Sequence, residues 1–330
     1  MPGFVNAHSH TFQRVLRGRT GGGDFWTWRE EMLLEAGRQS PESVRSDYAA
    51  WYREMRSAGY TAVGEFHYLG LQEALAAVEA AAEAGIELVV LLAAYGRGGL
   101  PRFRQDSADA FLRQVDTLRA SGARVGLAPH SVRACSVGWF EAIGTYAVAE
   151  GLPLHVHADE QPREIEECLT EHGVRPIELL ARAGCLGPFT TVVHATHADA
   201  HELDLLADVG ARVCLCPTTE ADLGDGYAPV EALLERGIPI CIGSDSNVRI
   251  DPLEELRELE GIARRALGRR NVIPVETLLS FGAEEGAAAL GLEQWPDVSV
   301  ALEHASLAGV ARSHVPSALV SGCSAEVFRD

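Results

Sequence analysis

The sequence predicts an α/β fold, a (β/α)8 TIM barrel in which eight parallel strands alternate with helices. Two observations carry this prediction. A short apolar run rich in β-branched residues is followed by an amphipathic helical stretch, and this unit recurs eight times. The runs are continuously apolar rather than alternating, which is typical of parallel strands buried on both faces. Eight such units within 330 residues match the size of this barrel, whereas a doubly wound open sheet, the alternative, would not need eight.

The predicted strands follow the apolar runs in chain order. They are Gly3–His10, Thr61–Phe66, Glu87–Tyr95, Arg124–His130, Leu152–Glu160, Thr190–His197, Ala211–Thr219 and Ile238–Ser246. Stretches rich in Ala, Leu and Glu predict helices between them, for example at Glu73–Ala84, Ala108–Ala120, Gly138–Glu150 and His201–Val209. Two more helices are predicted after the eighth strand, at Asp251–Leu267 and Pro274–Leu290.

Composition and charge exclude several classes of protein. The chain has 28 basic and 47 acidic residues, and its net charge of −19 argues against a nucleic-acid partner. No apolar run approaches the length that spans a bilayer, and the N-terminal residues lack the features of a signal peptide, so we expect no membrane partner. Seven cysteines, an odd number spread along the chain, favour a reducing compartment, the cytoplasm, over a disulfide framework.

Polar side chains gather at the C-terminal ends of the predicted strands, the end that carries the active site in barrels of this kind. His8 and His10 end the first strand, and because they are two residues apart their side chains point the same way. His157 lies near the end of the fifth strand with Glu160 three residues further on, and Asp245 lies at the end of the eighth. Imidazoles and carboxylates crowded into one cavity would carry a large desolvation penalty, which a bound divalent metal removes.

Each of these residues, taken singly, also has a simpler interpretation. His8 and His10 could hydrogen-bond to carbonyl groups near a strand end, and Asp245 could cap a helix. His155 lies deeper in the fifth strand, which favours packing over a role as ligand. Asp159 is expected in solvent or at a helix cap. The sixth strand ends in two histidines, only one of which needs to face the centre.

Cys214 and Cys216 lie two residues apart on the predicted seventh strand. No third sulfur or imidazole follows them at a spacing typical of zinc sites. The signature of the zinc nucleoside deaminases, which pairs HxE with PCxxC, is also absent from the sequence. We therefore interpret both cysteines as apolar strand residues.

Four motifs at these strand ends resemble the metal-dependent amidohydrolase superfamily in its deaminase branch, and they read PGFVNAHSH, HVHADE, VHATH and GSDSN. The resemblance extends from Pro2 to about Leu290. Further segments resemble the formimidoylglutamate deiminase family of histidine degradation, and they read NAHSHTFQRVLRG, FWTWREEM, GYTAVGEFHYL and APHSVRA. This resemblance implies hydrolysis of N-formimino-L-glutamate to N-formyl-L-glutamate and ammonia.

The resemblance also implies roles for individual residues. It implies one divalent metal ion, zinc, with the ligands His8, His10, His157 and Asp245. Glu160 is expected to give a proton to the departing nitrogen, His194 to steady the tetrahedral centre, and Asp245 to accept the proton of the attacking water. The residues expected to hold the substrate are Gln13, Arg29, Tyr68, His130 and Arg133.

The expected partner is a small dicarboxylate, because two arginines offer planar forks that suit carboxylates. Position alone would make Arg29 a surface residue beside Glu30 and Glu31, and Tyr68 an ordinary loop residue. A related deaminase of guanine or another aminated heterocycle is the alternative, and a metal-binding fragment without catalysis is a third. The oligomeric state stays open, with a homodimer as one option. The glycine-rich loop Gly18–Asp24 could close over a bound ligand.

We expect two parts of unequal size, a hydrolase barrel at 1–295 and the remnant of a C-terminal β-sandwich segment at 296–330 with one strand at Val298–Leu302. The resemblance implies a longer segment before the two histidines of the first strand, which forms most of that sandwich. His8 lies near the start of this sequence, so we expect the sandwich to be largely missing. A strand without its sheet exposes an edge, which reduces stability.

Overall fold

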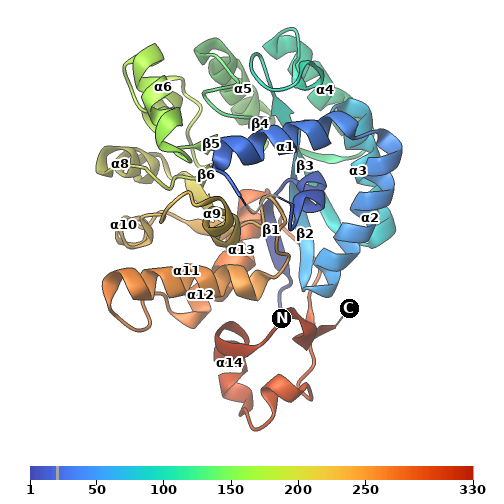
Figure 1. Cartoon of the computed structure of the whole chain (residues 1–330), viewed down its shortest axis with the longest axis vertical. Helices are drawn as coiled ribbons and strands as arrows, with labels where there is room; N and C mark the ends of the chain where they lie inside the picture. Colours follow the sequence, from blue (N-terminus) through green and yellow to red (C-terminus); the bar gives the residue numbers. More distant parts are fainter. Residues whose placement is uncertain (20–21, 330) are drawn as a thin grey trace.

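Eight parallel strands form the centre of the structure, a computed structural model that describes residues 1–19 and 22–329 (Figure 1). Each strand pairs in parallel with the next, in the order β1 to β8. A parallel bridge between Ser9 and Asp245 joins β1 to the segment after β8 and nearly closes the barrel. The predicted (β/α)8 fold is therefore confirmed. Residues 20 and 21 of the expected loop Gly18–Asp24 lie outside the described residues.

The strands begin near their predicted positions, but the last three, β6, β7 and β8, end three or four residues early. They are β1 (Phe4–Ser9), β2 (Tyr60–His67), β3 (Glu87–Ala94), β4 (Arg124–Pro129), β5 (Leu154–Ala158), β6 (Thr190–His194), β7 (Arg212–Leu215) and β8 (Ile240–Ile242). Strand β6 ends because His194 and Ala195 have positive φ angles of 75° and 50°. Strand β7 ends because Pro217 begins a helix, α9 (Pro217–Leu223). Several polar residues predicted at strand ends, among them Glu160, His197 and Asp245, therefore lie in loops, where functional residues are commonly found.

Helices surround the barrel (Figure 1). They are α1 (Phe25–Arg38), α2 (Pro41–Ser57), α3 (Leu71–Ala84), α4 (Ala108–Ala120), α5 (Val137–Glu150), α6 (Pro162–His172), α7 (Pro176–Arg182), α8 (Ala200–Val209), α9, α10 (Val230–Glu235), α11 (Pro252–Leu267), α12 (Val275–Gly282), α13 (Glu284–Ala289) and α14 (Val315–Gly322). The predicted helix Pro274–Leu290 is divided into α12 and α13, because the φ and ψ angles of Ala283, −128° and −84°, are not helical. Among the described residues, no helix has both the length and the apolar character needed to cross a membrane.

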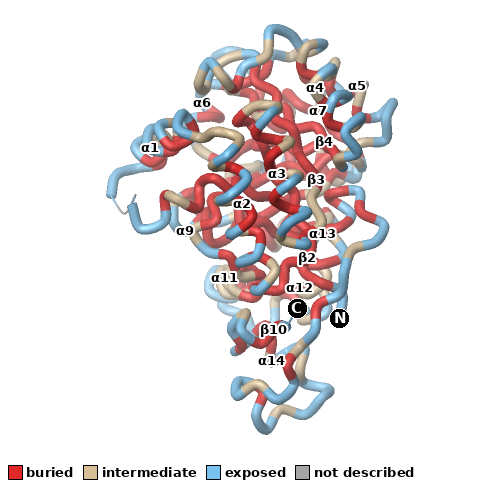
Figure 2. Tube along the Cα trace, turned by 90° about the vertical axis from the view of Figure 1, so that its right-hand side faces the viewer, coloured by how far each residue is buried: buried red, intermediate tan, exposed pale blue. Residues whose placement is uncertain are grey.

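The C-terminal segment lies at the opposite end of the barrel from the C-terminal ends of the strands. Its two short strands, β9 (Ser299–Val300) and β10 (Phe328–Arg329), pair antiparallel, so the predicted strand Val298–Leu302 is present but shorter. Phe328 packs edge-on against Phe4 of β1, with ring centroids 5.5 Å apart. Figure 2 shows the buried residues concentrated in the barrel, whereas the segment around α14 is largely exposed. The division into 1–295 and 296–330 stays a prediction.

Candidate active site

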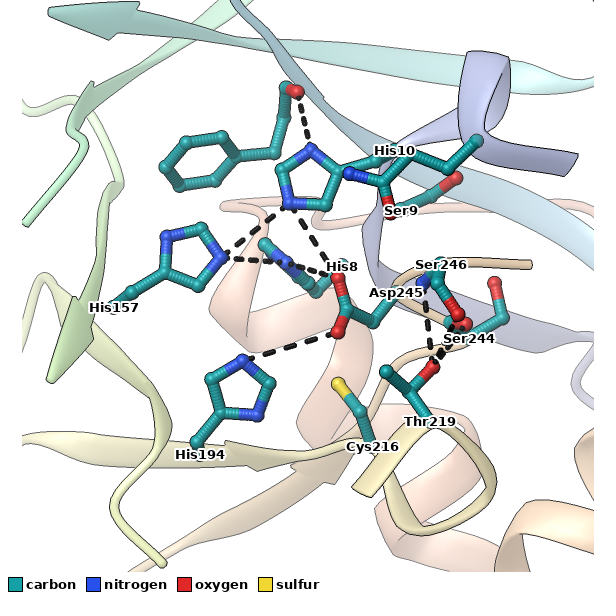
Figure 3. Close-up of polar contacts among 12 residues, drawn as sticks. His8, Ser9, His10, His157, His194, Cys216, Thr219, Ser244, Asp245 and Ser246 are labelled. Atoms are coloured by element: carbon teal, nitrogen blue, oxygen red, sulfur yellow. Dashed lines mark hydrogen bonds and ion pairs between the residues drawn. The ribbon is translucent and has the colours of Figure 1, made fainter. Parts of the chain in front are cut away.

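Three imidazoles and one carboxylate meet at the C-terminal end of the barrel (Figure 3). The Nε2 atom of His157 lies 3.2 Å from that of His8 and 3.4 Å from that of His10. The Oδ1 atom of Asp245 lies 3.3 Å from Nε2 of His8 and 3.4 Å from Nε2 of His10. All four side chains are buried. Strands β1, β5 and the loop after β8 thus bring together four residues that are up to 237 positions apart in the sequence.

The hydrogen bonds of two of these imidazoles fix where their protons lie. Nδ1 of His10 lies 3.0 Å from the carbonyl oxygen of Phe66, and Nδ1 of His157 lies 3.1 Å from that of His130. A carbonyl oxygen only accepts, so each Nδ1 carries the hydrogen and each Nε2 presents a lone pair. Burial lowers the pKa of both rings, so they stay neutral.

Two lone pairs 3.4 Å apart cannot hydrogen-bond to each other, and a cation between them would satisfy both. Burial also lowers the pKa of His8 to about 3, so this third ring is neutral as well. Burial would raise the pKa of Asp245, but the contacts with His8, His10 and the neighbouring His194 lower it overall, so the carboxylate is ionised. Three neutral imidazoles and one carboxylate form a donor set that fits a divalent metal ion such as zinc.

Glu160 and His194 lie beside this cluster. Nε2 of His194 is 3.8 Å from Oε1 of Glu160 and 3.8 Å from Oδ2 of Asp245. Burial would lower the pKa of His194, but a hydrogen bond to Glu220 and the nearby charges of Glu160 and Asp245 raise it to about 10. His194 is therefore a cation between carboxylates. The backbone here is strained, since Asp159, His194 and Asp245 all have positive φ angles.

All five predicted substrate residues line one cavity above the cluster: Gln13, Arg29, Tyr68, His130 and Arg133. Helix α1 supplies Arg29 and an apolar wall that includes Trp28 and Met32. The guanidinium of Arg163 on α6 lies 4.3 Å from the ring centroid of Trp26, a contact that ties α1 to α6.

The two arginines of the cavity differ in their partners. Nη2 of Arg133 donates to Oε2 of Glu160 at 2.9 Å, and its Nε lies 3.5 Å from Oε1 of Glu164. Within residues 1–19 and 22–329, the ion pair of Arg29 is a long contact of 3.7 Å with Glu30, which is largely exposed. Such an exposed pair contributes little energy, so the guanidinium of Arg29 is available to a ligand.

Two buried carboxylates near the site were not predicted. Oε1 of Glu220 lies 3.3 Å from Nδ1 of His194 and accepts the backbone N–H of Cys216 at 2.9 Å. Glu164 contacts Arg133 and accepts the backbone N–H of Glu160 at 3.1 Å. The available signal for Glu220 was its position directly after the predicted seventh strand.

The remaining polar residues of the strand ends lie as follows. Nε2 of His155 is 2.8 Å from the carbonyl oxygen of Ala289, inside the barrel, in agreement with its predicted role in packing. The expectation for Asp159 is wrong, because it is fully buried and 3.5 Å from Arg175. Its carboxylate needs this cation once the surrounding helices exclude water.

Comparisons with known proteins agree with this site. The model of the amidohydrolase family matches residues 1–294. The chain is 38% identical to formimidoylglutamate deiminase of Pseudomonas aeruginosa, over 88% of this chain and 72% of that protein. It is 31% identical to 5-methylthioadenosine/S-adenosylhomocysteine deaminase of Halobacterium salinarum, over 89% of this chain and 69% of that protein.

Two solved structures have the same fold as this chain. The crystal structure of an amidohydrolase from Brucella melitensis superposes with a TM-score of 0.88 and 30% identity, over 99% of this chain and 84% of that one. An adenosine deaminase from Xanthomonas campestris with bound zinc superposes with a TM-score of 0.90, over 99% of this chain and 77% of that one, and at 24% identity it supports the fold alone. Since the family match spans the whole barrel and includes every residue of the metal-capable cluster, the chain belongs to the amidohydrolase family, as a hydrolytic deaminase acting on carbon–nitrogen bonds.

Proposed function

We propose that this enzyme hydrolyses N-formimino-L-glutamate to N-formyl-L-glutamate and ammonia, with one zinc ion. The observation that carries the proposal is the pair Arg29 and Arg133 on a cavity whose floor is the cluster of three imidazoles and one carboxylate. A chain of net charge −19 repels a dianion unless the cavity reverses the local field. Two guanidiniums do this, and a substrate with two carboxylates uses both. The relative from Pseudomonas aeruginosa carries the name of this activity.

The four-residue cluster would hold the ion, with His8, His10 and His157 as neutral nitrogen donors and Asp245 as the oxygen donor. A bound zinc ion supplies Lewis acidity, which lowers the pKa of a water molecule toward about 7. Asp245 has a second oxygen, Oδ2, that faces His194 and can accept the proton of that water.

Glu160 and His194 would act on the substrate. The carboxylate of Glu160 would receive the proton that Asp245 takes from the water and give it to the departing nitrogen, so that ammonia leaves rather than an amide anion. The imidazolium of His194, 3.8 Å from both Glu160 and Asp245, stabilises negative charge that develops at the tetrahedral carbon. Arg133 donates to Glu160, so the residue that would bind a substrate carboxylate also orients the residue that would transfer the proton.

A second candidate is the deamination of an aminated heterocycle such as guanine or an adenine nucleoside. The observation that favours it is the apolar wall of the cavity, which includes Phe25, Trp28, Met32 and Leu33 and would suit a flat ring. The relative from Halobacterium salinarum is named for a substrate of this kind. The two arginines favour the dicarboxylate over the neutral ring.

The test is a direct comparison of substrates on protein of known metal content. Ammonia release is measured with N-formimino-L-glutamate, guanine and 5-methylthioadenosine, and zinc is determined in the same preparation. We expect turnover of N-formimino-L-glutamate at a kcat/KM of about 10⁴ M⁻¹s⁻¹ or more, the usual lower range for an enzyme on its own substrate. A higher kcat/KM with either heterocycle would replace the proposal with the second candidate.

A further inference from the structure

The described residues contain a second group of possible metal donors, next to the first and sharing one residue with it. His194, Cys216 and Asp245 each offer a donor atom, and these atoms all lie within 4.8 Å of one another. All three residues are buried. Cys216 directly follows β7, and Figure 3 shows its sulfur pointing toward the space between the imidazole of His194 and the carboxylate of Asp245.

The two oxygens of Asp245 face different groups. Oδ1 lies 3.3 Å from His8 and 3.4 Å from His10, whereas Oδ2 lies 3.8 Å from His194. One carboxylate can therefore serve two ions at the same time, with one oxygen for each. This leaves Oδ2 free for a second ion when the first is bound.

Three carboxylates surround His194 of the second group, so a metal ion that displaces the imidazolium proton leaves a positive charge among them. The carboxylates of Glu160 and Asp245 lie 3.8 Å from Nε2 of His194, and that of Glu220 lies 3.3 Å from its Nδ1. Access exists as well, because His194 and Asp245 line the cavity through which a substrate would enter. Cys216 belongs to the small apolar cluster that also contains Cys214.

We infer that His194, Cys216 and Asp245 form a second, inhibitory site for a thiophilic divalent ion such as cadmium or excess zinc. A thiolate, an imidazole and a carboxylate together select soft and borderline ions over magnesium or calcium. Binding forms a metal–sulfur bond and releases the thiol proton, together with the proton of the imidazolium, to water, and no electron is transferred. Cys214 and Cys216 both lie in an apolar cluster, in line with the interpretation from the sequence, and the inference adds ion binding to Cys216 alone.

The inhibitory effect rests on the proposed function, in which His194 and Asp245 act during turnover. An ion at the second site would occupy both side chains and stop their part in the reaction. Ion binding itself does not depend on that function, so binding and inhibition can be measured separately.

Cadmium is the probe, added to the purified enzyme with its first ion in place. Bound cadmium is measured by equilibrium dialysis and elemental analysis, and the thiolate-to-cadmium charge-transfer absorption is recorded in the near ultraviolet. The first cluster has no sulfur, so this absorption reports only an ion bound to cysteine. We expect one further equivalent of cadmium and the absorption band in the unmodified enzyme.

Three variants test the assignment. In Cys216→Ala the band should be absent, and the affinity for the further equivalent of cadmium should fall by more than about tenfold. Loss of a residue that only hydrogen-bonds to a metal ligand already lowers the affinity by about that factor, and Cys216 would be a ligand itself. Cys216→Ser carries the same expectation if the alanine variant does not fold. Cys214→Ser is the matched control, because it removes a buried thiol only two residues away, on β7, and should keep the band.

Each remaining outcome decides the question. A band that persists in Cys216→Ala, a band lost in Cys214→Ser, or cadmium uptake without a band would overturn the inference. Cadmium should slow turnover in the unmodified enzyme and in Cys214→Ser, but not in Cys216→Ala. If the band forms and turnover is unchanged, the ion site stands and the proposed roles of His194 and Asp245 are wrong.

Discussion

The two ends of the barrel bury different kinds of side chain. The C-terminal ends of the strands bury charged and polar groups, among them His8, Glu160 and Asp245, in a backbone with several positive φ angles. The opposite end buries aromatic rings, such as Phe4 against Phe328. Each strained residue costs of order 1–3 kcal/mol, and each buried charge needs a partner. The active-site end of the barrel therefore lowers the free energy of unfolding, and the apolar packing at the opposite end raises it. Substitutions at the two ends should therefore affect different properties.

The largest effect on activity is expected from His157, and strand β5 offers its own control. In His157→Leu the site loses a metal donor, so we expect bound metal and turnover to fall almost to zero. His155→Leu changes the same residue type two positions deeper, where Nε2 hydrogen-bonds to the carbonyl oxygen of Ala289. That variant should keep its metal and turnover but lose about 1–3 kcal/mol in the free energy of unfolding, because a buried acceptor is left unpaired. A full equivalent of metal in His157→Leu would remove it from the ligand set.

Glu160 is expected to matter for turnover without holding the ion. Glu160→Gln keeps the shape of the side chain but cannot transfer a proton, so kcat should fall by about 10² to 10⁴. The metal content should be unchanged, because Glu160 is not among the four donors of the first cluster. Glu166→Gln, on the exposed side of α6, is the control and should have normal kcat. Near-normal kcat in Glu160→Gln would contradict its role in proton transfer.

The contrast between the two ends also explains what the sequence could predict. The eight strands were predictable because burial on both faces leaves continuous apolar runs. The convergence of His8, His10, His157 and Asp245 followed from one rule, that the C-terminal ends of barrel strands face a common cavity. The strand boundaries on this side were less accurate, since β6 and β7 end where a positive φ angle and a proline interrupt them.

The supporting carboxylates could not be predicted for a physical reason. Glutamate is common on helices, and nothing local separates Glu164 from an exposed residue of the same kind, while the one local signal for Glu220 is its position directly after the predicted seventh strand. Each is significant only through a partner distant in the sequence, His194 for Glu220 and Arg133 for Glu164. The proximity of Cys216 to Asp245 was missed for the same reason. The spacing of cysteines along the chain does not show which residues of other strands lie beside them.

At the opposite end of the barrel, Phe328→Ala should change stability and leave the reaction intact. The ring is 6% exposed and packs on Phe4 at the start of β1, so its removal leaves a cavity between the C-terminal segment and the barrel. Phenylalanine-to-alanine changes in cores cost 3–5 kcal/mol, and we expect about 3 kcal/mol at this peripheral position. Thermal unfolding should show a lower Tm, with kcat/KM unchanged. Phe328→Leu, which keeps most of the apolar contact, should lie in between.

A fall in kcat/KM for Phe328→Ala equal to that of a cavity variant would contradict the separation of the two ends. Strand β1, which carries Phe4 at one end and His8 near the other, would then transmit the effect of the substitution to the active site. Retention of both Tm and kcat/KM would instead show that the C-terminal segment contributes little to the barrel.

The smallest of these effects concerns specificity, and it separates the two arginines of the cavity. Loss of one charge-assisted contact costs about 1.5–3 kcal/mol, or about 10- to 150-fold in kcat/KM for N-formimino-L-glutamate. Arg29→Met should produce this loss mainly through KM, because its ion pair with the exposed Glu30 is long, 3.7 Å, and Arg29 does not contact Glu160 as Arg133 does among the described residues. Arg133→Met should also lower kcat, because Arg133 donates to Glu160. Bound metal should be unchanged in both, and an analogue with one carboxylate fewer should respond less. Equal losses with substrate and analogue would make Arg133 a structural residue, and an unchanged KM in Arg29→Met would return Arg29 to its interpretation as a surface residue.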